Sequence, residues 1–279
     1  MPQRVSSAED SSMYDEIRKA VRELLSTGEI QGFLALKQDG THVGPHLFVH
    51  PDELEQLVIG DGPDPGTARY PLLKTIQALL HSYPEARLGV LVRGCDERAL
   101  KALVAWNQIP PDLVVPVGVA CPQTLAEACQ CVQPYPEHCL EGEPTEPVEH
   151  KALPLEQVSP SRRWSSWLQE FEKCIKCYGC RNICPMCFCN ECALQSDDVV
   201  SLGEIPPQFP MFHLVRALHM IGRCVDCGLC EEACPADIPL RSLYKKVNDI
   251  IFTHFQFRPG FSTKERSPLH EVAEPPPTR

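Results

Sequence analysis

The 279-residue sequence has no long hydrophobic run and no excess of positive charge. Its longest apolar stretch, Leu113 to Cys121, is far shorter than the roughly 20 residues that a membrane-spanning helix needs. The chain carries 26 Lys and Arg against 37 Asp and Glu, a formal net charge of −11. A groove for nucleic acid needs the opposite sign. We therefore expect no membrane span and no nucleic-acid partner.

Two common sequence signals are also missing: a secretory signal peptide and a dinucleotide-binding fingerprint. The first residues include Glu9, Asp10, Asp15 and Glu16 and no apolar segment, which is unlike a secretory signal peptide. No Gly-x-Gly-x-x-Gly fingerprint follows a predicted strand, so the common dinucleotide-binding loop is absent. These two features favour a cytoplasmic protein without a Rossmann-type site.

Cysteine is abundant, with 16 residues, of which 11 lie between Cys174 and Cys234. Their spacing is that of metal ligands rather than of a disulfide framework, and this favours a reducing compartment. The chain is organised around these cysteines.

Two runs share the pattern C-x2-C-x2-C-x3-C-P, from Cys174 to Pro185 and from Cys224 to Pro235. This is the pattern of bacterial ferredoxins, in which thiolates hold [4Fe–4S] clusters and the fourth cysteine of each run ligates the other cluster. Cluster I is therefore predicted to use Cys174, Cys177, Cys180 and Cys234, and cluster II to use Cys224, Cys227, Cys230 and Cys184. Pairs of C-x2-C also bind zinc, but two complete runs that end in proline favour iron–sulfur clusters.

The first half of the chain predicts an α/β domain. Strands are expected at residues 32–36, 42–49, 88–92 and 113–119, and helices at 13–25, 71–80 and 97–106. A strand, helix, strand order implies a right-handed crossover and a mainly parallel sheet. Cys95 and Cys121 follow two of these strands, so we expect both at the edge where such sheets bind ligands.

The predicted domain limits follow changes in composition. They are a disordered lead (1–10), the α/β domain (11–132), an acidic, proline-rich linker (133–160), a helix-flanked dicluster ferredoxin-like α+β domain (161–258) and a tail (259–279). Helical apolar spacing predicts two buried stripes in the second domain: Met211, Leu214, Val215, Leu218 and Ile221, then Leu240, Leu243, Val247, Ile250 and Ile251.

Cys187, Cys189 and Cys192 directly follow the first run and are not needed for two clusters. With one distant ligand they would complete a third centre, either [4Fe–4S] or zinc. We expect the fourth ligand from the α/β domain, with Cys121 ahead of Cys95. The alternatives are that the three are free thiols, and that Cys129, Cys131 and Cys139 form a set alone or with Cys121.

Part of the chain resembles a known family. Leu88 to Val92, the following Gly94 to Leu100 and the segment Gly118 to Pro122 resemble the beta subunit of deazaflavin-coenzyme (F420) hydrogenases and formate dehydrogenases, over roughly residues 12–140. The run from Cys184 to Cys192 looks like iron–sulfur subunits of formate dehydrogenases and of heterodisulfide-reductase-type assemblies. The resemblance implies FAD beside a [4Fe–4S] cluster, and electron transfer to the deazaflavin or to ferredoxin.

Two main functions are consistent with these features. In the first, the chain is a non-catalytic iron–sulfur subunit that relays single electrons in a soluble complex with catalytic and electron-accepting subunits. In the second, it is an FAD-containing oxidoreductase that itself reduces a deazaflavin or ferredoxin, with a flavin pocket beside Gly94 and Cys95. A sensor or assembly protein is a third interpretation. No general base or nucleophile stands out elsewhere in the sequence.

Overall fold

The computed structural model describes residues 14–60, 69–149, 157–201, 203, 205 and 210–268. The chain divides into two compact units. The first takes Met1–Glu97 and Ile109–Glu149, and the second takes Arg98–Gln108 and His150–Arg279, in both cases as far as the residues are described. The domain limits expected from composition stay predictions.

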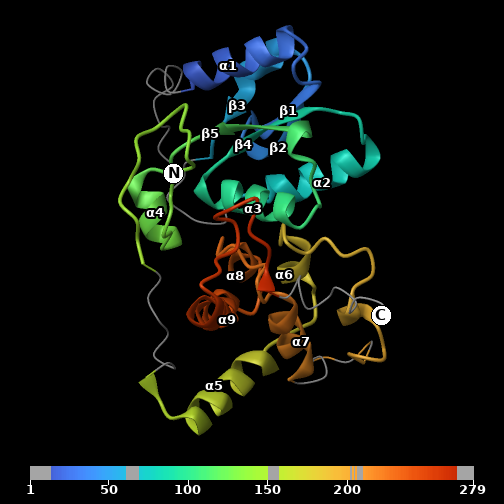
Figure 1. Ribbon diagram of the computed structural model, residues 1–279, viewed down its shortest axis with the longest axis vertical. Coiled ribbons are helices and arrows are strands. Elements are labelled where there is room, and N and C mark those ends of the chain that lie inside the picture. The colour runs from blue at the N-terminus through green and yellow to red at the C-terminus, as the bar shows by residue number, and fades with distance from the viewer. Residues whose placement is uncertain are drawn as a thin grey trace, which may run out of the picture. The chain divides into compact units, whose positions relative to one another are not determined.

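The first unit is built on a mixed five-stranded sheet (Figure 1). Its strands are β1 (Gly32–Asp39), β2 (His42–Phe48), β3 (Leu57–Val58), β4 (Leu88–Val92) and β5 (Val114–Gly118). The order is β2-β1-β4-β5, with β3 also paired to β1. β1, β4 and β5 are parallel, whereas β2 and β3 are antiparallel to β1. The α/β class is confirmed, with antiparallel strands added to its parallel centre.

The sequence explains the centre of this sheet. All five residues of β4 are buried, as expected for an apolar strand that has neighbours on both edges and helices on its faces. β1 and β2, which lie where two strands are predicted, form an antiparallel hairpin, and Gly40 supplies the left-handed turn conformation at φ +60°. Figure 1 shows α1 (Asp15–Ser26) and α2 (Leu72–Ser82) on opposite sides of the strands. Their apolar faces complete the core.

The remaining elements lie in one unit or the other, except the α-helix Gly94–Ala105, which begins in the first unit and ends in the second. They are η1 (Pro51–Gln56), α3 (Gly94–Ala105), η2 (Pro111–Leu113), α4 (Gln123–Cys129), α5 (Pro160–Glu172), α6 (Gly179–Asn182), η4 (Ala193–Gln195), α7 (Met211–His219), α8 (Leu229–Glu232) and α9 (Leu240–Phe255). The sequence predicts that α3 begins at Glu97, but it begins at Gly94. Asp96 therefore lies inside its first turn, where the carboxylate accepts a hydrogen bond from the Arg93 N–H at 3.1 Å. No helix among the described residues combines the length and the apolar character that a membrane crossing requires.

Residues 134–148 run back along the end of β5 within the first unit. The Leu140 N–H donates to the Gly118 carbonyl at 2.9 Å, and the Ala120 N–H donates to the Glu141 carbonyl at 3.0 Å. The fit is tight at Gly118, because a Cβ there would meet the His138 carbonyl oxygen. This acidic, proline-rich segment is therefore hydrogen-bonded to the end of β5 and to the residues that follow it.

In the second unit, the two cysteine runs have the same backbone conformation. α6 and α8 contact each other and start one residue before the third cysteine of their runs. Left-handed φ values occur at matching positions, Lys176 with Asp226 and Tyr178 with Gly228. Three of these residues are not glycine, and such conformations persist only where the surroundings enforce them. The repeat seen in the sequence is thus also a structural repeat.

The predicted apolar stripe on α7 is wrong. The buried residues of this helix are Phe212, His213, Arg216 and Ala217, whereas Met211 is 44% exposed and Leu218 is 60% exposed. On α9, Leu240 and Ile251 are buried as predicted, but Ile250 is 50% exposed, and Arg241 and Tyr244 are buried. Both helices direct polar side chains, not only apolar ones, toward the cysteine runs.

Candidate metal centre

The cysteines predicted for cluster I lie near one another in the second unit. Burial raises the pKa of the Cys174 thiol to about 11; a hydrogen bond from the Lys176 N–H lowers it, and the neighbouring Cys180, Cys234 and Cys177 raise it further. The Lys176 N–H donates to Cys174 Sγ and the Gly179 N–H donates to Cys177 Sγ, both at 3.4 Å. Cys234 therefore lies close to the first run, although it belongs to the second.

The cysteines predicted for cluster II line one cavity. Cys184, from the first run, lies in its wall together with Cys224, Cys227 and Cys230. Burial raises the pKa of Cys224 to about 12 and that of Cys230 well above its usual value. Cys184 of the first run thus lies beside three cysteines of the second run, and the crossed ligation of two clusters stays a prediction.

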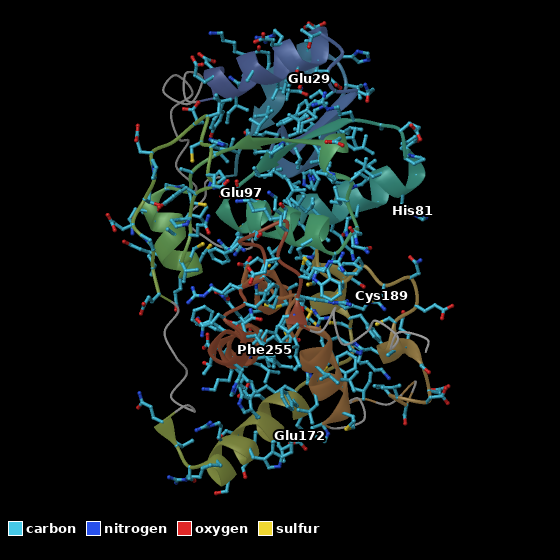
Figure 2. All side chains as sticks on the ribbon, viewed as in Figure 1. Glu29, His81, Glu97, Glu172, Cys189 and Phe255 are labelled. Atoms are coloured by element: carbon cyan, nitrogen blue, oxygen red, sulfur yellow. The ribbon has the colours of Figure 1, made fainter. Side chains whose placement is uncertain are left out.

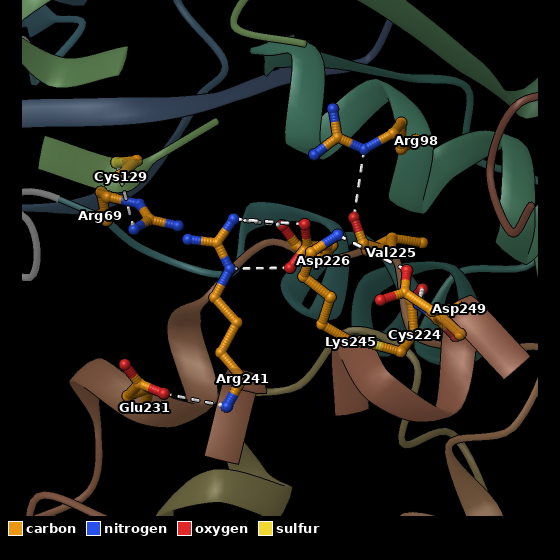
Figure 3. A network of polar contacts seen from close by, with 11 residues as sticks. Arg69, Arg98, Cys129, Cys224, Val225, Asp226, Glu231, Arg241, Lys245 and Asp249 are labelled. Carbon is orange, nitrogen blue, oxygen red and sulfur yellow. Dashed lines mark hydrogen bonds and ion pairs between the residues drawn. The ribbon is translucent and has the colours of Figure 1, made fainter. Parts of the chain in front are cut away.

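An ion pair forms another part of this cavity wall. Arg241 Nε donates to the Asp226 carboxylate at 2.7 Å, and the Arg241 backbone N–H donates to Glu231 at 3.0 Å (Figure 3). Both Arg241 and Asp226 line the cavity. The guanidinium charge of Arg241 is therefore balanced within the protein, and the pair fixes the loop that carries Cys224 and Cys227.

Arg216 is a second buried cation beside the cysteines, and sequence reasoning missed it. It is only 2% exposed. Its Nη2 donates to the Cys180 carbonyl at 2.7 Å, its Nη1 donates to Cys187 Sγ at 3.1 Å, and its guanidinium lies 5.5 Å from the centre of the Tyr244 ring. None of these partners is a carboxylate. A charged residue on a helix usually faces solvent, so no sequence signal distinguished it.

These cysteines have the donor chemistry of a thiolate-ligated cluster. A metal site must deprotonate its thiols, and burial opposes this here by raising the pKa of Cys174, Cys224 and Cys230. Backbone N–H donors to sulfur and the buried Arg216 favour the thiolate form in return. The described residues thus fit an anionic, sulfur-bound group in each set.

Cys187, Cys189 and Cys192 have different surroundings. Cys187 contacts Arg216 as given above, and it hydrogen-bonds to Cys184. Cys189 Sγ accepts a hydrogen bond from Arg223 Nη1 at 3.7 Å and lies at the surface, where Figure 2 labels it. The Arg223 guanidinium in turn lies over the rings of Trp106 and Phe188, at 4.2 and 4.8 Å. Arginine thus faces two of these three sulfurs.

Cys121 lies in the first unit, where three other cysteines are near. Burial raises the pKa of the Cys121 thiol; Arg93 lowers it, and Cys131 and Cys129 raise it. Burial also raises the pKa of Cys95, whose neighbours include Cys131 and Cys121. Arg93 Nη1 donates to Cys121 Sγ at 3.3 Å, and Arg69 Nη1 donates to Cys129 Sγ at 3.5 Å.

The sequence placed Cys95 and Cys121 at one edge of the sheet, and this is where the parallel pairing of Val92 with Gly118 leads them. The sequence indicates only weakly that Cys129 and Cys131 belong to a ligand set, because their spacing matches no single motif. The signal that could have found them is the helix α4, which directly follows Cys121 and ends at Cys129.

Gly94, predicted to border a flavin pocket together with Cys95, is closely covered. A Cβ at Gly94 would meet the Gln133 carbonyl oxygen, with the Tyr135 carbonyl oxygen 2.8 Å away. The backbone of residues 133–135 therefore fills the space directly beside this glycine.

Within the described parts of the chain, no three His, Cys, Asp or Glu side chains are grouped as the ligands of a single metal ion. A zinc ion needs its ligands around one point, whereas a [4Fe–4S] cluster offers a separate iron to each thiolate. A zinc site and a [4Fe–4S] site therefore require different spacings between the sulfur atoms of their cysteines.

The known proteins to which this chain is similar include two formate dehydrogenase beta subunits. The F420-dependent formate dehydrogenase subunit beta of Methanocaldococcus jannaschii is 42% identical over 106 residues, which cover 38% of this chain and 27% of the relative. The F420-dependent formate dehydrogenase 1 subunit beta of Methanococcus maripaludis is 48% identical over 112 residues, which cover 40% of this chain and 28% of the relative. No family model matches the sequence.

The resemblance to beta subunits of F420-dependent enzymes is confirmed by these relatives. The chain spans little more than a quarter of the length of the two relatives. The coenzyme and the substrate in their names therefore describe those two proteins and are not assigned to this chain. Their names say nothing about an iron–sulfur module.

Proposed function

We propose that this chain is the iron–sulfur electron-transfer subunit of a redox complex of the formate dehydrogenase, hydrogenase or heterodisulfide-reductase type. The observation that carries the proposal is the crossed cysteine arrangement, in which Cys184 joins Cys224, Cys227 and Cys230 around one cavity. The similarity to formate dehydrogenase beta subunits supports the same class of complex. Partner subunits would carry out catalysis and accept the electrons.

The proposed ligands are the two sets already described, in a dicluster ferredoxin-like domain. When bound, a [4Fe–4S] cluster supplies the ability to take up and release one electron. The chain positions the thiolates through its repeated left-handed loops and donates N–H groups of Lys176 and Gly179 to sulfur. It also buries Cys174, Cys180 and Cys184. These are the features by which proteins set cluster potentials.

A third centre remains part of the proposal, and its predicted ligands divide between the units. Cys187, Cys189 and Cys192 belong to the second unit and Cys121 to the first. Within the first unit, Cys95, Cys129 and Cys131 are neighbours of Cys121. Substituting Cys129 and Cys131 together by serine, and separately Cys187, Cys189 and Cys192, would tell which set holds additional metal.

The second function, a flavoenzyme that reduces a deazaflavin or ferredoxin itself, rests on the relatives that are named F420-dependent. It requires flavin in the purified chain, recognised by its absorbance and by its release on acid denaturation. The backbone that covers Gly94 favours the first function over a flavin seated at that residue.

The test of the proposed function is to substitute the one cysteine that each run is predicted to contribute to the cluster of the other run. Cys184→Ser should remove cluster II although Cys184 lies in the first run, and Cys234→Ser should remove cluster I. Each variant should lose about four of about eight irons, and low-temperature electron paramagnetic resonance (EPR) of the reduced protein identifies the cluster that remains. If each substitution instead removed the cluster of its own run, the crossed ligation would be wrong.

A further inference from the structure

The buried Arg216 has no acidic partner among the residues that the structure describes. Its hydrogen-bond and ring partners are the Cys180 carbonyl, Cys187 Sγ and the Tyr244 ring, and its Nε has no partner among the described residues. The side chain is 2% exposed. A buried charge is strongly unfavourable unless an opposite charge compensates it. An anion close to Arg216 is therefore required.

Tyr244 gives a second and independent indication of a bound group. Its side chain is 1% exposed, it lines the cavity of Cys184 and Cys224, and its hydroxyl has no hydrogen-bond partner among the described residues. Buried hydroxyls in native proteins are nearly always hydrogen-bonded. The hydroxyl is therefore placed to donate to a group that occupies this cavity.

Arg216 lies between the two cysteine sets. It lines the cavity of the second set, and its guanidinium bonds to the carbonyl of Cys180, which belongs to the first set. Arg241 lines the same cavity, but Asp226 neutralises it at 2.7 Å. Among the cations that line this cavity, Arg216 is the one whose charge no carboxylate balances in the described residues.

Resting on the proposed function, we infer that Arg216 is a shared counter-charge that raises the reduction potential of both clusters, with Tyr244 as a hydrogen-bond donor to cluster II. Reduction adds one negative charge to a cluster. A buried cation stabilises that charge strongly, because the surroundings screen it poorly, and a hydrogen bond to sulfur acts in the same direction. A cation between the two sites would keep both potentials high together, and electron exchange between the clusters would then cost little free energy.

The test measures the midpoint potentials of both clusters in the full-length, anaerobically reconstituted chain by EPR-monitored redox titration. Arg216→Gln should lower both potentials, so that the ratio of reduced to oxidised cluster at a fixed potential falls about tenfold, or about 59 mV for one electron. Arg216→Lys keeps the charge and should stay close to wild type. Tyr244→Phe should lower the potential of cluster II by a smaller amount.

The matched control is Arg181→Gln, which removes one positive charge from a side chain that lies in the first cysteine run and bonds to Asn182 near the surface. It should leave both potentials almost unchanged. The inference is overturned if Arg216→Gln retains its iron and its potentials, or if Arg216→Lys shifts them as far as Arg216→Gln does. If Arg216→Gln cannot hold iron, the potentials of Tyr244→Phe and Arg216→Lys test the inference instead. A cluster II potential that stays unchanged in Tyr244→Phe would then contradict it. A wild-type chain without about eight irons would contradict the proposed function instead.

Discussion

The two units of this chain are stabilised in different ways. The first unit has an aliphatic and aromatic core, with Phe33, Phe48 and Ile76 fully buried around a paired sheet. In the second unit, the cysteine runs contain only four-residue helices and left-handed loop positions. Its buried polar or charged residues among those described are Arg98, His213, Arg216, Arg241 and Ser267. Hydrophobic burial accounts for the first unit but not for the loops of the second.

Under the proposed function, this difference arises because the second unit is completed by the clusters that its cysteines bind. Helices of one turn are not stable alone, and buried cations without carboxylates destabilise a fold. A thiolate-ligated metal compensates both, because its binding free energy becomes folding free energy. The sheet of the first unit does not need a bound metal in this way, because its apolar core stabilises it.

Removal of iron should therefore separate the behaviour of the two units. In the iron-free full-length chain, amides between Cys174 and Pro235 should exchange with solvent at least about 1,000-fold faster, equivalent to about 4 kcal/mol. Amides of β1, β4 and β5 should keep their protection. Hydrogen exchange measured by mass spectrometry before and after anaerobic chelation gives the answer. Simultaneous opening of both units, or full protection in both, would contradict this comparison.

A substitution in the sheet should produce the opposite pattern. Gly118→Ala places a Cβ against the His138 carbonyl, and because backbone cannot move aside easily, the first unit should lose about 3 kcal/mol of stability. The iron content should not change. Gly44→Ala is the control, since its Cβ would meet only the His42 ring. Denaturant unfolding followed with iron analysis tests this, and loss of iron in Gly118→Ala would count against the independence of the units.

A smaller effect is expected at His213, in the second unit. Burial, with Arg216 adding to it, lowers the pKa of His213 from 6.5 to about 4. In the unfolded chain the imidazole takes up a proton near pH 6.5, so its contribution to stability is complete above that pH and is lost as the pH falls toward 4. At pH 5 the loss should be about 2 kcal/mol.

His213→Phe should remove that pH dependence. The imidazole stacks on Phe171 with ring centres 4.7 Å apart and has no hydrogen-bond partner for either nitrogen within the described chain. A phenyl ring fits the same stacking without a group that titrates. Denaturant midpoints at pH 7 and pH 5, compared between variant and wild type, provide the measurement. An equal loss in both proteins would show that His213 does not contribute.

The sequence predicted those features that depend on local patterns. The hairpin at Gly40, the apolar strands β4 and β5, and the repeated cysteine runs all follow from residue type and spacing. Arg216 and the buried face of α7 could not be predicted, because apolar periodicity assumes an apolar core, and this helix packs instead against cysteines. The packing of residues 134–148 on β5 was missed for a related reason: an acidic, proline-rich segment shows no periodicity, and its backbone rather than its side chains makes the contacts.

The content of metal, inorganic sulfide and exchangeable electrons in one sample of anaerobically purified full-length protein tests the central claim most directly. Two crossed clusters require about eight irons and about eight sulfides per chain, and two electrons taken up in a redox titration. A third cluster would raise the iron to about twelve. Zinc in place of iron, without sulfide and without electron uptake, would contradict the account.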